Sequence, residues 1–325
     1  MVAFAARADG LRVATWHGDF SRKGPGLLLR ELVAGDVDLT PIISADPDIL
    51  VLTDIDYDGG LAALGAMQKG LRERGADLRH AFAVRPNTGW QTGLDLDGDG
   101  RTGGPRDAQG YGLFSGQGGV AVLSRYPVAM EADFSRLPWG EAPDSNMMSG
   151  DTGQDVQRLS SAAHWALRVD GADGPFLLLT LAATPPVFDG PEDRNGRRNH
   201  DEVLLWGHYL DGRLGAPPGL PVVIAGNLNL DPERGEGLHE AVQTLLAHPR
   251  LTDPQPGVET VSWDSTGPMR VSYVLPDKAF DVLGAGVMPS EGDSDPGRHR
   301  LVWVDLSLRP AARLPAQSPP SPGSG

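Results

Sequence analysis

The sequence contains no cysteine, which excludes disulfide bonds, thiolate metal sites and thiol nucleophiles and leaves the redox compartment unreadable. It also lacks any apolar run long enough to cross a bilayer. Basic residues are few, with 28 Lys and Arg against 43 Asp and Glu, and the net charge is -15. A field of this sign repels polyanions unless one face is locally basic, so the composition argues against long nucleic acid as a partner.

The remaining composition is that of a globular protein, with 40% hydrophobic and 22% charged residues over 325 positions. Short β-rich runs alternate with helical patterns along the whole length, which predicts an α/β fold. No linker interrupts them, so we expect one domain over residues 11–308. Two stretches rich in Gly, Pro and Asp, roughly 86–117 and 130–158, are expected to be long loops.

The two ends of the chain differ from this pattern. Residues 1–10 include Ala6-Arg7-Ala8, which resembles the end of a signal peptide, so export and cytoplasmic residence both stay open. Residues 309–325 are rich in Pro, Ser and Gly and are expected to be disordered. The sequence does not indicate an oligomeric state.

Six short motifs follow one another at the ends of expected strands. They are Ala14-Thr15-Trp16, residues 47–54, residues 119–125, Gly226-Asn227-Leu228-Asn229, residues 270–275 and Arg298-His299-Arg300. No single motif is specific, but in this order and spacing they resemble the endonuclease/exonuclease/phosphatase superfamily, the DNase I-like proteins. The resemblance covers about residues 11–308. It implies an α/β four-layer sandwich, in which two mixed β-sheets pack face to face and helices flank them.

The resemblance also implies a chemistry. Members of the superfamily hydrolyse phosphate esters with a divalent cation, usually Mg²⁺, a carboxylate that activates water, and a histidine pair that stabilises the developing charge. Here the metal-binding Glu corresponds to Asp54. The positions of Asn229 in the third-last motif and of the final His299 are retained.

The other corresponding positions are substituted. The first-strand Asn corresponds to His17, a poorer ligand for a hard cation. The Asp that serves as base corresponds to Asn227, whose amide cannot take a proton at neutral pH. The first catalytic His corresponds to Ala182 or Ala183, and two further Asp positions correspond to Ser272 and Arg298. The candidate catalytic positions are therefore His17, Asp54, Asn227, Asn229 and His299.

These substitutions support two hypotheses. In the first, the protein is a catalytically degraded family member, a pseudoenzyme that retains an anion- or metal-binding cleft for a small phosphorylated or anionic ligand. Losing the base alone costs roughly 10²- to 10⁴-fold in rate. In the second, it is an active metal-dependent phosphoesterase for a small phosphomonoester or phosphodiester, with Mg²⁺ or another divalent cation on Asp54. Such an enzyme would use Asp54, Asn229 and His299, with His17 as a further candidate, and Asp231 is the best replacement for the missing base.

A calcium site is predicted outside the cleft. Asp95, Asp97 and Asp99, with Gly98 and Gly100, match the start of a calcium-binding loop. Arg106 stands where that loop type has its bidentate Glu, but Asp107 follows and could supply a carboxylate. The alternative is an acidic solvated turn, in which the carboxylates repel one another.

A basic segment follows the strand that would carry the first catalytic His. Arg194, Arg197, Arg198 and His200 lie where a helix is expected to start, so they could bind a phosphate or another anion. The alternative is that the arginines pair with acidic residues of the same segment and fix the loop, the partners being Asp189, Glu192, Asp193 and Asp201. A third interpretation joins His17, His200 and Asp54 as ligands of a transition metal.

Overall fold

The computed structural model describes residues 10–288 and 298–309, and every structural statement below concerns those residues. Except for Gly10 and Arg309, the expected N-terminal segment and C-terminal tail lie outside them. No helix in the described part of the chain has the length and hydropathy to cross a membrane.

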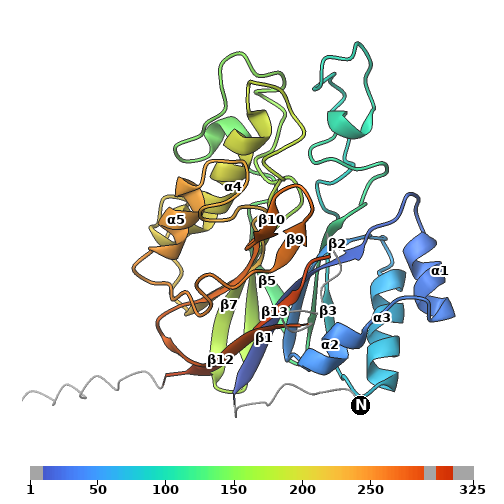
Figure 1. The fold of residues 1–325 in the computed structure, drawn as a ribbon, viewed down its shortest axis with the longest axis vertical. Coiled ribbons are helices and arrows are strands. Elements are labelled where there is room, and N and C mark those ends of the chain that lie inside the picture. Colours follow the sequence, from blue (N-terminus) through green and yellow to red (C-terminus); the bar gives the residue numbers. More distant parts are fainter. Residues whose placement is uncertain (1–9, 289–297, 310–325) are drawn as a thin grey trace, which may run out of the picture.

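The first sheet has six strands in the order β12-β13-β1-β2-β4-β3 (Figure 1). Its central strands β1 and β2 run parallel, with His17 opposite Thr53, and its other neighbours are antiparallel. The strands are β1 (Leu11–Phe20), β2 (Ile49–Ile55), β3 (His80–Phe82), β4 (Gly119–Ser124), β12 (Phe280–Met288) and β13 (Leu301–Leu308).

The second sheet has five strands in the order β11-β8-β7-β6-β5. The pair β7 and β8 is parallel and the other pairs are antiparallel, so both sheets are mixed. The strands are β5 (Val128–Asp133), β6 (His164–Gly171), β7 (Gly174–Ala182), β8 (Val222–Asn227) and β11 (Ser272–Pro276). A separate hairpin joins β9 (Val261–Trp263) to β10 (Gly267–Met269).

The two sheets pack face to face over one apolar core. Val13, Val51 and Val122 of the first sheet contact Leu178 and Val223 of the second sheet within a single buried cluster. Alternate residues on β1 and β2, such as Ala14 and Leu50, belong to the opposite face and a second cluster. Because successive side chains of a strand point to opposite faces and both faces are buried here, the central strands are apolar at nearly every position.

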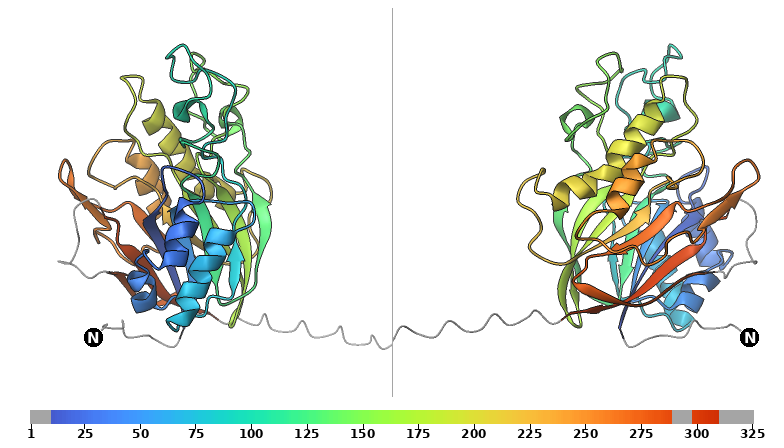
Figure 2. Two further views of the ribbon diagram at one scale, coloured as in Figure 1. Left: turned by 90° about the vertical axis from the view of Figure 1, so that its right-hand side faces the viewer. Right: turned by 60° about the vertical axis from the view of Figure 1, so that its left-hand side comes forward.

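Helices cover both outer faces, which gives the four layers expected (Figure 2). Helices α1 (Leu27–Ala34), α2 (Thr40–Ala45) and α3 (Ala62–Glu73) pack on the first sheet. Helices α4 (Arg194–Leu210) and α5 (Glu240–Leu246) pack on the second sheet. The α/β sandwich predicted from the sequence is thus confirmed.

The sequence misplaced some boundaries. Helix α4 begins at Arg194, so the basic segment lies within the first two turns of the helix. Residues 130–133 belong to β5 and not to a loop. The loop over 86–117 contains one short 3₁₀ helix (Pro105–Asp107), and the loop after β5 contains another (Trp139–Glu141).

Candidate functional site

The strand ends of the two sheets bring the candidate residues together. His17 lies on β1 beside Thr53 of β2, and Asp54 follows Thr53 directly. In the second sheet, Asn227 ends β8 and lies between Ala182 of β7 and Ser272 of β11. Strand registers therefore place the substituted positions next to one another, as the resemblance implied.

Asn227 bridges the two sheets. Its Nδ2 lies 3.1 Å from Nδ1 of His17 and donates to Oδ1 of Asn229 at 3.0 Å. Its Oδ1 accepts the backbone N–H of Asn229 at 3.1 Å, which fixes which end of the amide is which. The side chain is buried and cannot turn over without losing all three bonds.

This amide also determines the tautomer of His17. An amide NH₂ can only donate, so Nδ1 of His17 accepts and the proton of the neutral ring is on Nε2. Burial lowers the pKa of His17, opposed by the nearby charges of Asp54 and Asp19. A neutral ring held in this form can donate a hydrogen bond from Nε2, but it has no free lone pair there with which to accept a proton.

His299 forms a pair with His17. Their ring centres are 4.3 Å apart with a tilt of 41°, and Trp263 of β9 contacts the edge of His299. Trp16 donates from Nε1 to the backbone oxygen of His299 at 3.0 Å, which holds this segment against β1. Burial and the adjacent His17 keep the pKa of His299 well below its usual range. Within the described residues the buried Nδ1 of His299 has no hydrogen-bond partner.

Asp54 lies at a sharp bend where β2 ends. Its φ of 57° is in the left-handed region, which is strained for a non-glycine residue and is found at functional sites more often than elsewhere. Its Oδ1 is so close to Gly118 that a Cβ there would come within 2.8 Å. Burial raises the pKa of Asp54, against the lowering effects of His17, a hydrogen bond from Ser21 and Arg22.

Asp56 is a second buried carboxylate beside Asp54, and the sequence reasoning missed it. It accepts the backbone N–H groups of Arg22 at 3.0 Å and Gly118 at 3.2 Å. Burial nevertheless raises the pKa of Asp56 to about 6. Asp56 also lines a cavity of about 350 Å³ together with Leu28, Arg85 and other residues. Two Asp residues separated by one apolar residue, Asp54-Ile55-Asp56, were the sequence signal that could have indicated a second carboxylate here.

Asn229 has the same backbone conformation as Asp54, with a φ of 51°. Its Nδ2 donates to the backbone oxygen of Ala183 at 2.7 Å. By the resemblance, Ala182 or Ala183 corresponds to the family's first catalytic His. The main chain of Ala183 is bonded to Asn229, and the Ala183 side chain offers no hydrogen-bond donor. Ser272 is buried, and within the described residues its hydroxyl has no partner.

The donor set in this cleft does not match the family's full metal centre. Asp54 and Asp56 supply carboxylates, but the amide oxygen of Asn229 accepts from Asn227, and Nδ1 of His17 faces the same Asn227 amide. Among the described residues, no three His, Asp or Glu side chains of the cleft place ligand atoms within 4.8 Å of one another. The same holds for His17, His200 and Asp54, whose ligand atoms do not converge on one metal position. Mg²⁺ keeps several waters and can be held by one or two carboxylates, which is the part that Asp54 could play.

Asp231, the expected replacement base, stabilises a turn by accepting backbone hydrogen bonds. Its Oδ1 accepts the N–H groups of Glu233 and Arg234, and its Oδ2 accepts that of Arg270 at 2.6 Å. Three backbone bonds to one carboxylate leave it little capacity to orient water.

The basic segment on α4 holds the loops in place. Arg197 forms a bidentate ion pair with Asp151 at 2.8 and 2.9 Å. Arg198 is buried and donates to the backbone oxygens of three loop residues, and Arg194 donates to two loop oxygens and to Gln157. His200 contacts Asn146 and Asp201 through Nδ1. The arginines therefore fix the loops, but through Asp151 and backbone oxygens and, among the described residues, not through ion pairs with Asp189, Glu192, Asp193 or Asp201. Anion binding at this segment stays a prediction.

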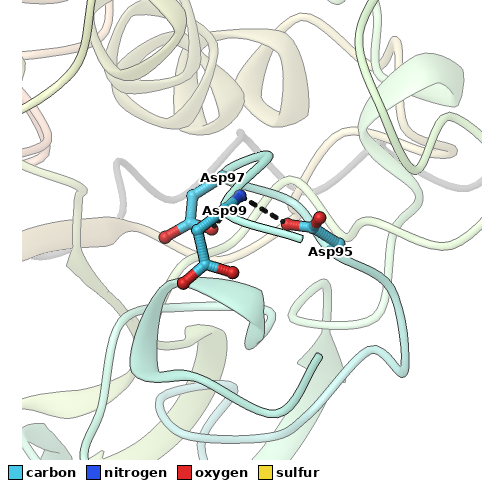
Figure 3. A group of neighbouring side chains, drawn as sticks. All are labelled: Asp95, Asp97 and Asp99. Atoms are coloured by element: carbon cyan, nitrogen blue, oxygen red, sulfur yellow. Dashed lines mark hydrogen bonds between the residues drawn. The ribbon is translucent and has the colours of Figure 1, made fainter. Parts of the chain in front are cut away.

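The three loop carboxylates converge as a cation site would require. Oxygens of Asp95, Asp97 and Asp99 lie within 4.8 Å of one another (Figure 3). Asp95 accepts the N–H groups of Asp99 at 3.1 Å and Gly100 at 2.8 Å. Asp107 is buried below and accepts the N–H groups of Leu96 and Gly104, so its oxygens hold the base of the loop.

The arrangement of layers, strand orders and cleft defines a DNase I-like sandwich. Residues 21–299 match the model of the Endonuclease/Exonuclease/phosphatase family. The chain therefore belongs to this family. No curated protein matches the chain.

Solved structures agree with this assignment at the level of the fold. An endonuclease/exonuclease/phosphatase from Beutenbergia cavernae DSM 12333 is similar with a TM-score of 0.57 and 22% identity, over 92% of this chain and 72% of that one. A family protein from Leptotrichia buccalis gives 0.54 and 13%, over 92% and 100%. The catalytic domain of human Nocturnin, solved with a bound sulfate anion, gives 0.52 and 15%, over 92% and 93%.

Proposed function

We propose that this protein is a family member that binds a small phosphorylated or anionic ligand in the cleft between its two sheets and does not hydrolyse it. The observation that supports this most directly is the contact between Asn227 and His17. A carboxylate at position 227 would accept a hydrogen bond from Nδ1–H and leave Nε2 unprotonated, free to act as a base. The amide produces the opposite tautomer, so neither side chain can take a proton from water.

The rest of the cleft supports binding without chemistry. Nε2 of His17 carries a proton that can be donated to a phosphoryl oxygen, and His299 has a ring nitrogen without a partner among the described residues. Ala182 and Ala183 supply no donor at the position of the family's first catalytic His.

Binding in the cleft can be tested by imidazole NMR with a non-hydrolysable phosphonate diester. We expect the Cε1–H signals of His17 and His299 to shift in a saturable manner, while His248, which follows α5 and contacts Asp211, stays constant. Saturable shifts at His248 alone, or none at all, would contradict the proposal.

A second candidate is a metal-dependent phosphoesterase acting on a small phosphoester. The strained backbone of Asp54 and its proximity to Asp56 at Gly118 favour it, because strain and paired carboxylates are typical of metal-binding active sites. In this alternative Asp54 would hold a hydrated Mg²⁺. Turnover that requires both a divalent cation and Asp54 would distinguish it from the first candidate.

A further inference from the structure

Two arginines, Arg85 and Arg158, stack on Trp90, and the charge of a third, Arg136, acts on Arg158. The guanidinium carbon of Arg85 lies 3.8 Å from the centre of the Trp90 ring, and that of Arg158 lies 4.4 Å from it. Burial lowers the pKa of Arg158, and the charges of Arg136 and Arg85 lower it further against the opposing charge of Asp133, so both cations are close enough to act on Arg158. The sequence reasoning missed this cluster, because its members come from three separate segments.

A buried asparagine holds the cluster in a fixed geometry. Asn87 accepts a hydrogen bond from Arg158 at 2.6 Å through Oδ1. Its Nδ2 donates to the backbone oxygens of Ser135 at 2.6 Å and Ser160 at 2.7 Å, which are the neighbours of Arg136 and of the Arg158 segment. The cations are thus positioned before any ligand arrives, which lowers the entropy cost of binding.

The charges of this cluster are not neutralised within the protein. In residues 10–288 and 298–309, none of the three arginines has a carboxylate within ion-pair distance, and Asp133 is the acidic group whose charge acts on Arg158. If the contact with Trp90 only joined two loops, one arginine on the ring would be enough, whereas two arginines lie on it. Three cations at one place repel one another, and an anion between them would remove that repulsion.

We propose that Arg85, Arg136 and Arg158 form a binding site for a phosphate-type oxyanion, separate from the cleft residues His17 and His299. Guanidinium groups match the geometry of phosphate oxygens through paired N–H donors. Arg85 and Arg136 are exposed, so a ligand can reach them from solvent. Three cations suit an anion of more than one charge, such as two linked phosphates. This site does not depend on the proposed function of the cleft.

The test is calorimetric titration of the full chain with pyrophosphate and with inorganic phosphate, in 150 mM NaCl without divalent cations. Arg136→Gln and Arg158→Gln should each weaken pyrophosphate binding about tenfold or more, since each removes a charge-assisted hydrogen bond. Arg79→Gln is the matched control, because Arg79 is equally cationic and exposed but pairs with Asp77 near β3. It should bind as the wild type does.

Two further results decide the proposal. Asp54→Ala changes the cleft alone and should leave pyrophosphate affinity unchanged. Because Arg136 is exposed, loss of binding in Arg136→Gln cannot be attributed to unfolding, and circular dichroism would confirm this for Arg158→Gln. Absence of binding in the wild type, or equal weakening by Arg79→Gln, would overturn the proposal.

Discussion

Asn227 donates from Nδ2 to Nδ1 of His17 across 3.1 Å, and this bond joins β8 of one sheet to β1 of the other. It fixes both the orientation of the amide and the tautomer of the imidazole. The first prediction follows directly from it.

Replacing Asn227 by Asp should move the proton of His17. The new carboxylate would accept from Nδ1, so His17 should change from the Nε2–H to the Nδ1–H tautomer, and its pKa should rise. Nitrogen-15 NMR of the imidazole rings measures both changes. His164 is the internal control, because it is bonded to Ser160 and Glu202, and its pKa of about 4 should not move. An unchanged His17 tautomer would refute the assignment.

The histidine pair should make stability depend on pH. The pKa of His299 is well below its usual value of 6.5 because of burial and of His17. The unfolded chain therefore binds protons that the folded protein does not, so stability is highest above pH 6.5 and falls as the pH is lowered below it.

Thermal unfolding between pH 7 and pH 5 measures this effect. His299→Gln should lose less stability over that interval than the wild type, whereas His80→Gln, at the start of β3, should follow the wild type. Equal losses in all three proteins would show that His299 is not responsible.

Asp56 should act with the opposite sign. Burial raises its pKa to about 6 from the usual 3.8, so the folded protein binds more protons than the unfolded chain between these values. Stability therefore falls as the pH rises from 4 to 6, and the loss is complete above pH 6. Relative to Asp56→Asn, the wild type should become progressively less stable over this range in chemical denaturation. A difference that does not vary with pH would contradict the assignment.

Calcium should order the loop of Asp95, Asp97 and Asp99. At a free concentration 100 times the dissociation constant, binding would stabilise the fold by about 2.7 kcal/mol. The midpoint of thermal unfolding should be higher with Ca²⁺ than with excess chelator in the wild type, and the increase should disappear in Asp97→Ala. An equal increase in both proteins would place the calcium site elsewhere. No increase in either would identify the loop as an acidic turn.

Much of the fold could be predicted from the sequence, because apolar runs such as Ile49–Thr53 and Pro221–Ala225 carry both the strand signal and the burial on two faces. The order of the motifs then placed His17, Asp54, Asn227 and His299 at neighbouring strand ends. The direct contacts of Asn227 with His17 and of His17 with His299 agree with that placement.

Contacts between distant segments could not be predicted in the same way. Arg198 has the composition of an anion-binding residue, but its donors reach backbone oxygens 39 to 89 residues away. Arg85 and Arg158 meet only on Trp90. Asp56 becomes conspicuous only when its burial is known. Each of these features depends on tertiary packing, which local sequence patterns do not encode.

The most direct test of the central claim is hydrolysis of a chromogenic phosphodiester by the wild type and by Asp54→Ala, with Mg²⁺, Mn²⁺, Zn²⁺ and Ca²⁺ in turn. Because Asn227 cannot act as a base and Ala183 cannot donate, the wild type should show no turnover above that of the variant with any of these metals. Metal-dependent turnover that Asp54→Ala abolishes would contradict the account and identify the protein as an active phosphoesterase.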